Sequence, residues 1–303
     1  MKKYFAITAM LAMGVTAEAQ QQVELPAELA AQLAAMQQAV KSVDLFSMVQ
    51  DARCGQIVVS CLINGQPVRM MLDTGATHTV LHDESAARLQ GLQWVDTSKM
   101  KFRGNSAQQP RIALGALHVA AEFAPQHAFM VVSLASVRSM MAEQIDGILG
   151  MDVLGALPFT FDQAAGKFYW GVPQSARLVP LYGRRDDNGR LMVDVSCKGQ
   201  VMELLLDTGS SITRVHADRW LPGKCGEVVA RLGNVDVASS RTVQKGQPAD
   251  VELTPGVVVK QLMPIFCPAN DRTMLGMDAL SNVVLVHLPG APGNEFGSFF
   301  IAK

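Results

Sequence analysis

Two short segments of the sequence place a carboxylate directly before a threonine and a glycine. Asp73-Thr74-Gly75 follows an apolar run that ends at Leu72, and Asp207-Thr208-Gly209 follows a run that ends at Leu206. The apolar run is typical of a buried strand end, and the glycine lets backbone N–H groups approach the carboxylate. Because Asp-x-Gly is also common in ordinary turns, one such segment alone indicates little. Its chemistry depends on whether the two segments are related.

The two segments occupy equivalent places in an internal repeat. Residues 57–75 align with residues 191–209 at a constant offset of 134, and both copies predict a strand, a glycine-containing turn, a strand and Asp-Thr-Gly. A second pair of segments, 148–154 and 274–280, aligns at an offset of 126 and carries Leu-Gly-Met-Asp in both copies. The chain is therefore a duplication, and chance turns in two unrelated β-domains would not give this collinear order.

A pseudo-two-fold axis between the two halves would bring Asp73 and Asp207 face to face. Two close carboxylates cannot both ionise cheaply, so they share one proton and titrate as a pair. The charged member can take a proton from a bound water while the neutral member donates to a substrate carbonyl oxygen. We therefore predict hydrolysis of peptide bonds in a protein or peptide substrate, with no metal and no cofactor.

The rest of the chain predicts the elements that would position this pair. Beyond residue 50, short β-branched and apolar runs alternate with Gly, Pro, Asn and Asp, which is typical of an all-β protein. With 303 residues, 49% of them hydrophobic, the chain is long enough for two cores. We expect an N-terminal β-lobe over residues 51–175 and a C-terminal β-lobe over residues 176–303, with a linker near residues 173–188.

With these features the sequence resembles the aspartic peptidases of the pepsin and retropepsin group over residues 55–300, as an exported bacterial form with two Asp-Thr-Gly motifs. The resemblance is carried by residues 73–77, 207–211 and 145–150, where the last segment reads Ile-Asp-Gly-Ile-Leu-Gly. It implies a bilobal pepsin-like fold with a catalytic cleft between two pseudo-symmetric lobes. Because one chain supplies both half-sites, it also implies activity as a monomer.

The resemblance implies a role for each residue of the two motifs. Asp73 and Asp207 would bind the nucleophilic water. The neighbouring residues would support the two loops: Thr74 and Thr208 by bracing one loop against the other, and Gly75 and Gly209 by presenting backbone donors. Ala76 and Ser210 would belong to the same supporting set. Ala76 has no hydroxyl to donate to a carboxylate, whereas Ser210 could supply one to Asp207. Gly150 and Gly276 would lie on strands that pass closely beneath the loops.

The sequence departs from the pepsin pattern at the flap, the hairpin that covers the cleft. Pepsins carry a tyrosine there, but the tyrosines of this chain are at positions 4, 169 and 182. We place the flap within residues 100–106, because Gly104-Asn105 is a turn signal between possible strands. Its central residues are Phe102, Arg103, Gly104 and Asn105. The missing tyrosine leaves open a second interpretation, a peptide-binding or regulatory module without turnover.

The N-terminus has the pattern of a secretion signal. Lys2 and Lys3 precede the apolar residues 5–15, and Ala17-Glu18-Ala19 forms a small-x-small cleavage site. We therefore expect residues 1–19 to be removed and the protein to be periplasmic or secreted. The apolar stretch is shorter than the roughly 20 residues needed to span a bilayer, and we expect no membrane span after removal of the signal.

Residues 20–50 differ from the rest of the chain. From Pro26 an Ala/Gln-rich segment carries apolar residues at helical spacing, which predicts an amphipathic helix. This N-terminal segment could be a propeptide, a partner-binding arm or a helix that packs on the body. The formal net charge of the chain is -1 and Lys and Arg form no sustained run, so we expect no nucleic-acid partner.

Five cysteines remain after the expected cleavage, at positions 54, 61, 197, 225 and 267. Export permits disulfide bonds, and an odd number leaves at least one cysteine unpaired or intermolecular. Cys225 and Cys267 flank much of the second half, so a bond between them is the first candidate. A metal site is the weaker interpretation, because no cysteine lies in a Cys-x-x-Cys pair or beside a histidine at ligand spacing.

The histidines that follow the first Asp-Thr-Gly motif are weaker candidates for chemistry. His78 and His82 could be read as a metal-binding pair. The repeat, however, places Ile212 at the position of His78 and His216 at that of His82. We therefore favour a packing or surface role for both histidines.

Overall fold

The computed structural model describes residues 44–97, 110–174, 176–186, 189–233, 238–290 and 297–303. Residues 38–303 belong to one compact unit. The expected signal peptide and the helical pattern after Pro26 lie outside the described residues. The described end of the expected 20–50 segment contains a strand, β1 (Met48–Gln50), which pairs with the body of the protein.

The fold is all-β, as predicted, with 51% of the residues in strands and 9% in helices. The first sheet has the strand order β1-β2-β3-β8-β4-β7-β6-β5, and an additional pairing of β2 with β6 closes part of it on itself. Its further strands are β2 (Ile57–Ile63), β3 (Gln66–Leu72), β4 (Val80–His82), β5 (Gln93–Val95), β6 (Arg111–Val119), β7 (Glu122–Val132) and β8 (Gly147–Leu149). Its helices are α3 (Asp83–Arg88), α4 (Ala135–Arg138) and α5 (Met151–Leu154). We call this part the first lobe.

The second lobe repeats this plan. Its sheet has the order β16-β17-β20-β15-β21-β14-β13-β18-β19, and β12 pairs with β13 beside this path. The strands are β12 (Gly183–Arg185), β13 (Leu191–Cys197), β14 (Gln200–Leu206), β15 (Arg214–His216), β16 (Lys224–Gly233), β17 (Ala238–Gly246), β18 (Ala249–Thr254), β19 (Val257–Leu262), β20 (Ile265–Cys267) and β21 (Met274–Leu275). A 3-10 helix, η1 (Ala217–Arg219), and α6 (Met277–Leu280) complete the lobe.

The repeat in the sequence corresponds to matching strand registers in the two lobes. In the first lobe β3 pairs in parallel with β8, so that Leu72 lies opposite Leu149. In the second lobe β14 pairs in parallel with β21, so that Leu206 lies opposite Leu275. Each Asp-Thr-Gly motif therefore follows a strand whose parallel neighbour ends in the Leu-Gly-Met-Asp segment. The pseudo-symmetric β-lobes predicted from the sequence are confirmed.

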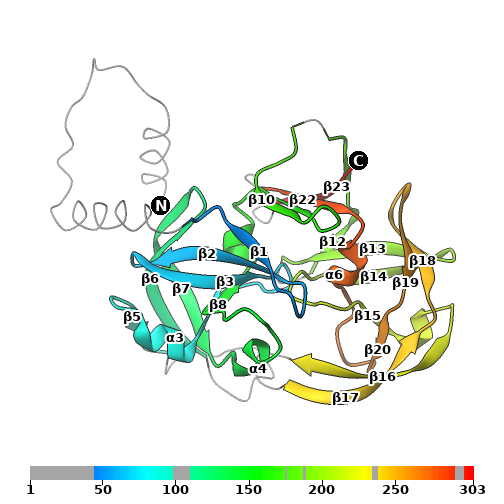
Figure 1. Cartoon of the computed structure of the whole chain (residues 1–303), viewed down its shortest axis with the longest axis horizontal. Coiled ribbons are helices and arrows are strands. Elements are labelled where there is room, and N and C mark those ends of the chain that lie inside the picture. Colours follow the sequence, from blue (N-terminus) through cyan, green and yellow to red (C-terminus); the bar gives the residue numbers. More distant parts are fainter. Residues whose placement is uncertain (1–43, 98–109, 175, 187–188, 234–237, 291–296) are drawn as a thin grey trace. The chain divides into compact units, whose positions relative to one another are not determined.

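A third sheet combines strands from both halves of the chain, with the order β10-β9-β22-β23-β11. Its strands are β9 (Phe159–Asp162), β10 (Lys167–Trp170), β11 (Leu178–Pro180), β22 (Val284–Leu288) and β23 (Ser298–Ala302), and Figure 1 shows β10 near β22 and β23. The expected linker near residues 173–188 contains two short strands, β11 and β12. The strand β11 forms because it pairs with the last strand of the chain, Val179 opposite Ile301.

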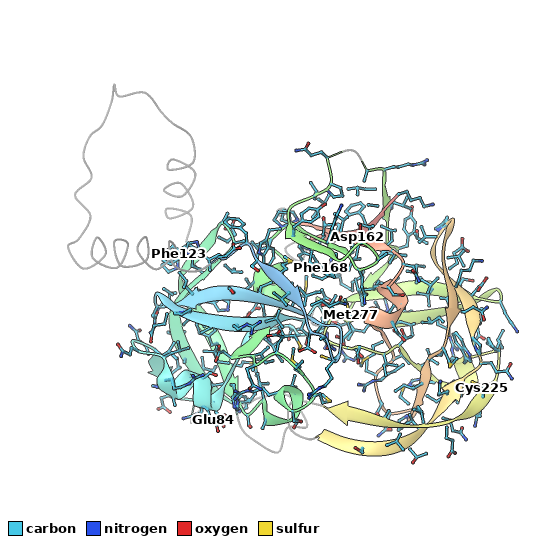
Figure 2. The ribbon with its side chains drawn as sticks, in the orientation of Figure 1. Glu84, Phe123, Asp162, Phe168, Cys225 and Met277 are labelled. Atoms are coloured by element: carbon cyan, nitrogen blue, oxygen red, sulfur yellow. The ribbon has the colours of Figure 1, made fainter. Side chains whose placement is uncertain are left out.

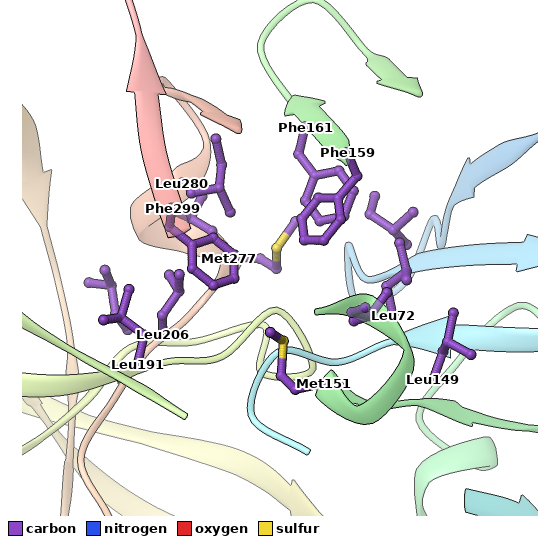
Figure 3. Close-up of a cluster of buried hydrophobic side chains, with 14 of the residues drawn as sticks. Leu72, Leu149, Met151, Phe159, Phe161, Leu191, Leu206, Met277, Leu280 and Phe299 are labelled. Carbon is purple, nitrogen blue, oxygen red and sulfur yellow. The ribbon is translucent and has the colours of Figure 1, made fainter. Parts of the chain in front are cut away.

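One cluster of buried apolar side chains extends through both lobes and the third sheet. Figure 3 shows Met151 and Met277, which are equivalent in the repeat, between Leu72 and Leu149 of the first lobe and Leu191 and Leu206 of the second. The aromatic side chains of Phe159, Phe161 and Phe299 cover the methionines from the third sheet. Because this core lies under both Asp-Thr-Gly motifs, it fixes the two lobes beneath the site.

All five cysteines of the described chain are free. The disulfide expected between Cys225 and Cys267 is therefore wrong, and the strand order gives the reason. Cys225 lies on β16 (Figure 2) and Cys267 on β20, and β17 lies between these two strands. Two strand spacings separate the residues by about 9.5 Å, whereas a disulfide needs Cα atoms within about 7 Å.

Candidate active site

Two loops follow β3 and β14 and carry the Asp-Thr-Gly motifs; we call residues 73–77 the first loop and residues 207–211 the second loop. Each loop is attached to the strand beside it in the same way. The backbone N–H of Asp73 donates to the carbonyl of Leu149, and that of Asp207 donates to the carbonyl of Leu275, both at 3.1 Å. The parallel strands β8 and β21 therefore hold the two aspartates at equivalent places.

The two threonines join the loops to each other. The N–H of Thr74 donates to Oγ1 of Thr208, and the N–H of Thr208 donates to Oγ1 of Thr74, both at 3.1 Å. Each hydroxyl also donates across the axis, Thr74 to the carbonyl of Leu206 at 2.8 Å and Thr208 to that of Leu72 at 3.1 Å. Both threonines are buried. The loops are thus braced in the manner that the resemblance implies.

The glycines allow each aspartate to contact the opposite loop. A Cβ on Gly75 would lie 2.6 Å from Cγ of Asp207, and a Cβ on Gly209 would lie 2.5 Å from Cγ of Asp73. No side chain fits in this space, so glycine is required in both loops. The structure therefore brings the two carboxyl groups together, each against the glycine of the other lobe.

The hydrogen bonds of the two carboxyl groups differ. Oδ1 of Asp73 accepts the backbone N–H of Gly75 at 2.8 Å and that of Ala76 at 3.0 Å. Oδ1 of Asp207 is buried and has no hydrogen-bond partner among the described residues. The N–H of Gly209 also lowers the pKa of Asp207, but the first loop places two donors on one oxygen of Asp73, which favours the charged form there.

The pKa values follow the same asymmetry. Burial raises the pKa of Asp73 above its ordinary value, although the N–H donors and the Asp207 side chain act against this change. Burial, followed by the negative charge of Asp73 and a side-chain hydrogen bond with it, raises the pKa of Asp207 well above its ordinary value. Although both residues keep some exposed surface, the opposite loop encloses their carboxyl groups. The surroundings thus favour the negative charge on Asp73 and the shared proton on Asp207.

Ser210 does not take the role that the sequence suggested. Its Oγ donates to the backbone carbonyl of Ile212 at 2.9 Å. A hydroxyl has one proton to donate, so Ser210 cannot also donate to Asp207 while it makes this bond. The difference between the two aspartates therefore arises from backbone donors and nearby charges.

A pair of aspartates beneath the loops was missed by sequence reasoning. Asp152 accepts from both the N–H and the hydroxyl of Thr79, at 2.9 and 2.8 Å. Asp278 accepts the same two bonds from Thr213, at 2.9 and 2.6 Å. Each threonine hydroxyl then accepts the N–H of the glycine before the helix, Gly150 or Gly276. The signal for this arrangement was present in the sequence, because Leu-Gly-Met-Asp occurs in both copies of the repeat.

The glycines of these segments lie as close to the loops as the sequence suggested. A Cβ on Gly150 would lie 2.6 Å from the backbone carbon of His78, and one on Gly276 would lie 2.6 Å from that of Ile212. Contrary to the expectation from the sequence, Gly150 and Gly276 are not on strands but directly follow β8 and β21 and precede α5 and α6. Because they have no side chain, the backbone can pass close to residues 78 and 212.

The other predicted residues are those of the flap and the histidines that follow the first loop. Phe102, Arg103, Gly104 and Asn105, where we expect the flap, lie outside the described residues. His82 is buried and its Nδ1 accepts the N–H of Leu134 at 3.0 Å, which is a packing role. Across the described ranges, no group of His, Cys, Asp and Glu side chains is arranged to hold a metal ion.

Three comparisons with known proteins bear on this geometry. The model of the aspartyl protease family matches residues 59–153, the part of the chain that carries Asp73. This match supports an aspartic peptidase family. Among solved structures, conglutin gamma, a basic 7S globulin from lupine seeds, is similar over 85% of this chain and 94% of its own, with a TM-score of 0.50 and 10% identity. At this identity the likeness shows the fold alone, a bilobal one. No curated protein matches the chain.

Proposed function

We propose that the protein is an aspartic endopeptidase whose catalytic residues are Asp73 and Asp207. The observation that carries the proposal is the approach of two carboxyl groups with raised pKa values, each packed against the glycine of the other loop. A general base and a general acid are then present together, on loops that hydrogen bonds hold rigidly.

The reaction divides between the two aspartates according to their charge. Asp73 takes a proton from a bound water while the water oxygen attacks the carbonyl carbon of the peptide bond. Asp207 donates its proton to the carbonyl oxygen, so that a neutral tetrahedral diol forms. Asp73 then passes the proton to the amide nitrogen, the C–N bond breaks, and Asp207 recovers its proton from a hydroxyl of the diol.

A peptide-binding or regulatory module without turnover is the second candidate. It is favoured by the likeness to a protein described as a basic 7S globulin from seeds, because a fold by itself does not imply an enzyme. The two candidates differ in their chemistry at one place. Binding alone does not require a charged and a protonated carboxyl group in contact, whereas hydrolysis does.

Location and oligomeric state are part of the proposal. The basic and apolar N-terminus supports export to the periplasm or the medium. In the described part of the chain, no helix has the length and apolar character needed to cross a membrane. Both half-sites lie in one chain, which supports a monomeric enzyme that acts on a protein or peptide substrate without a cofactor.

Turnover of a peptide library tests the proposal. The wild-type protein and Asp207→Asn are incubated with the library at several pH values, and new termini are identified by mass spectrometry. Asp218→Asn is a matched control, because this aspartate is exposed on η1. We expect cleavage by the wild type and the control alone. Binding of peptides without cleavage by any variant would favour the second candidate.

A further inference from the structure

Two matching turns lie directly before the strands that lead to the loops. Asp51 begins the turn between β1 and β2, where its N–H donates to the carbonyl of Gln56 at 2.7 Å. Asp186 begins the turn between β12 and β13, where its N–H donates to the carbonyl of Arg190 at 2.9 Å. Gln56 and Arg190 stand at equivalent positions, at the offset of 134 that relates Asp73 and Asp207.

Each turn supplies one side chain that crosses to the opposite lobe. Nε2 of Gln56 donates to the carbonyl of Gly209 at 3.0 Å. A guanidinium nitrogen of Arg190 donates to the carbonyl of Gly75 at 3.3 Å. The two contacts are equivalent in position but differ in charge, because a neutral amide supports the second loop and a cation supports the first.

The contact of Arg190 reaches the carboxylate through one peptide unit. The carbonyl of Gly75 and the N–H of Ala76 belong to the same planar peptide and point in opposite directions. That N–H donates to Oδ1 of Asp73 at 3.0 Å. Arg190 therefore holds the peptide in the orientation that Asp73 needs, and it places a positive charge behind the same peptide.

Arg190 is itself held in place. Its Nε and a terminal nitrogen donate to Oδ2 of Asp186 at 3.0 and 2.6 Å, and both side chains are 14% exposed. Arg272, which is more exposed at 44%, contacts the same carboxylate oxygen at 3.3 Å. Two guanidinium N–H groups on one carboxylate oxygen restrict a half-buried side chain, so these bonds favour the geometry in which Arg190 reaches the first loop.

We propose that Arg190 is a positioning residue that fixes the first loop and makes Asp73 the ionised member of the pair. The proposal rests on the proposed function and adds to it the reason why the two equivalent aspartates take different roles. Among the described residues, the charge of Arg214 lowers the pKa of Asp207, and the charge of Asp73 raises it. A side-chain hydrogen bond with Asp207 lowers the pKa of Asp73. The positive charge of Arg190 acts on Asp73 and lowers its pKa against the effect of burial.

Arg190→Gln is the decisive variant, because it gives the second turn the residue that the first turn already uses. Loss of the cation raises the pKa of Asp73, so the acid limb of the kcat/KM profile moves to higher pH, by about 0.5 to 1 unit. Arg190→Lys keeps the charge and should leave the limb within about 0.3 units of the wild type. Arg272→Gln removes a cation from Asp186 without a contact to the loop, and it serves as the control.

A direct titration separates this inference from the proposed function. The side-chain carboxyl carbons of Asp are followed by ¹³C NMR against pH, with the signals of Asp73 and Asp207 assigned from the Asp→Asn variants. We expect Asp73 to titrate at lower pH than Asp207 in the wild type, and to move upward in Arg190→Gln alone. The reverse order in the wild type, or an unchanged Asp73 in Arg190→Gln, would overturn the inference. Absence of peptide cleavage would refute the proposed function while leaving this titration valid.

Discussion

Gly209→Ala should lower the rate of hydrolysis by about 100-fold while the protein still folds. The new Cβ would lie 2.5 Å from Cγ and from Oδ2 of Asp73, whereas carbon atoms in contact are separated by about 3.5 to 4.0 Å. The second loop and the Asp73 carboxyl group must therefore move apart by roughly 1 Å. A misplacement of this size at reacting groups lowers the rate by about 100-fold, and overpacking costs about 1 to 3 kcal/mol of folding free energy.

The assay compares kcat/KM and the free energy of unfolding in the same preparations. Gly166→Ala is the control, because a Cβ there meets no atom within 4 Å while the positive φ of 61° makes alanine strained. We expect this control to lose about 1 kcal/mol of stability with unchanged activity. If Gly209→Ala retained more than half of the wild-type kcat/KM, the close packing of Asp73 against the second loop would be wrong as a requirement for catalysis.

Three further predictions concern pH, bracing and inhibition. Because the pKa values of Asp73 and Asp207 are both raised, the activity window should lie in the mildly acidic to neutral range. Ala76→Ser should leave the acid limb unchanged, because Ser210 at the equivalent position donates to a backbone carbonyl and not to its aspartate. A wild-type optimum in strong acid, or a shifted limb in the variant, would contradict this reasoning. Thr208→Val leaves the buried N–H of Thr74 and the buried carbonyl of Leu72 unpaired. It should lower the free energy of unfolding, measured by chemical denaturation, by about 2 to 4 kcal/mol. Thr242→Val, on the exposed face of β17, should leave this free energy unchanged. Finally, a statine-type compound should inhibit hydrolysis and a metal chelator should not, and the opposite pattern would indicate another mechanism.

The local elements could be predicted from the sequence because short-range patterns encode them. The strands of the repeat appear as β2, β3, β13 and β14 at the expected places. Their turns contain residues with positive φ, at Asn64 and Gly65 and again at Lys198 and Gly199. The duplication also predicted that the two aspartates approach each other, since a pseudo-two-fold axis relates equivalent positions in two similar lobes.

Pairings between distant segments could not be predicted in the same way. The third sheet joins β9 to β22, with Phe161 opposite Leu285, and no local periodicity records such a partner. Cys225 and Cys267 do not pair because β17 lies between β16 and β20, and this strand order is not recorded in a local sequence pattern. The contacts of Gln56 and Arg190 could not be predicted from the sequence for a different reason. Their shared offset of 134 is visible in the sequence, but the two residues differ in type and so did not stand out as a repeat.

The central claim is that Asp73 and Asp207 act as one unit, and a double-mutant cycle on hydrolysis tests it most directly. The cycle measures kcat/KM of the wild type, Asp73→Asn, Asp207→Asn and the double variant on one cleaved peptide. Since the base and the acid share a single proton, each single variant should lose at least about 1,000-fold, and the double variant should be no slower than either. Near-wild-type turnover by one single variant, or a double variant slower by the product of the two single losses, would contradict the account.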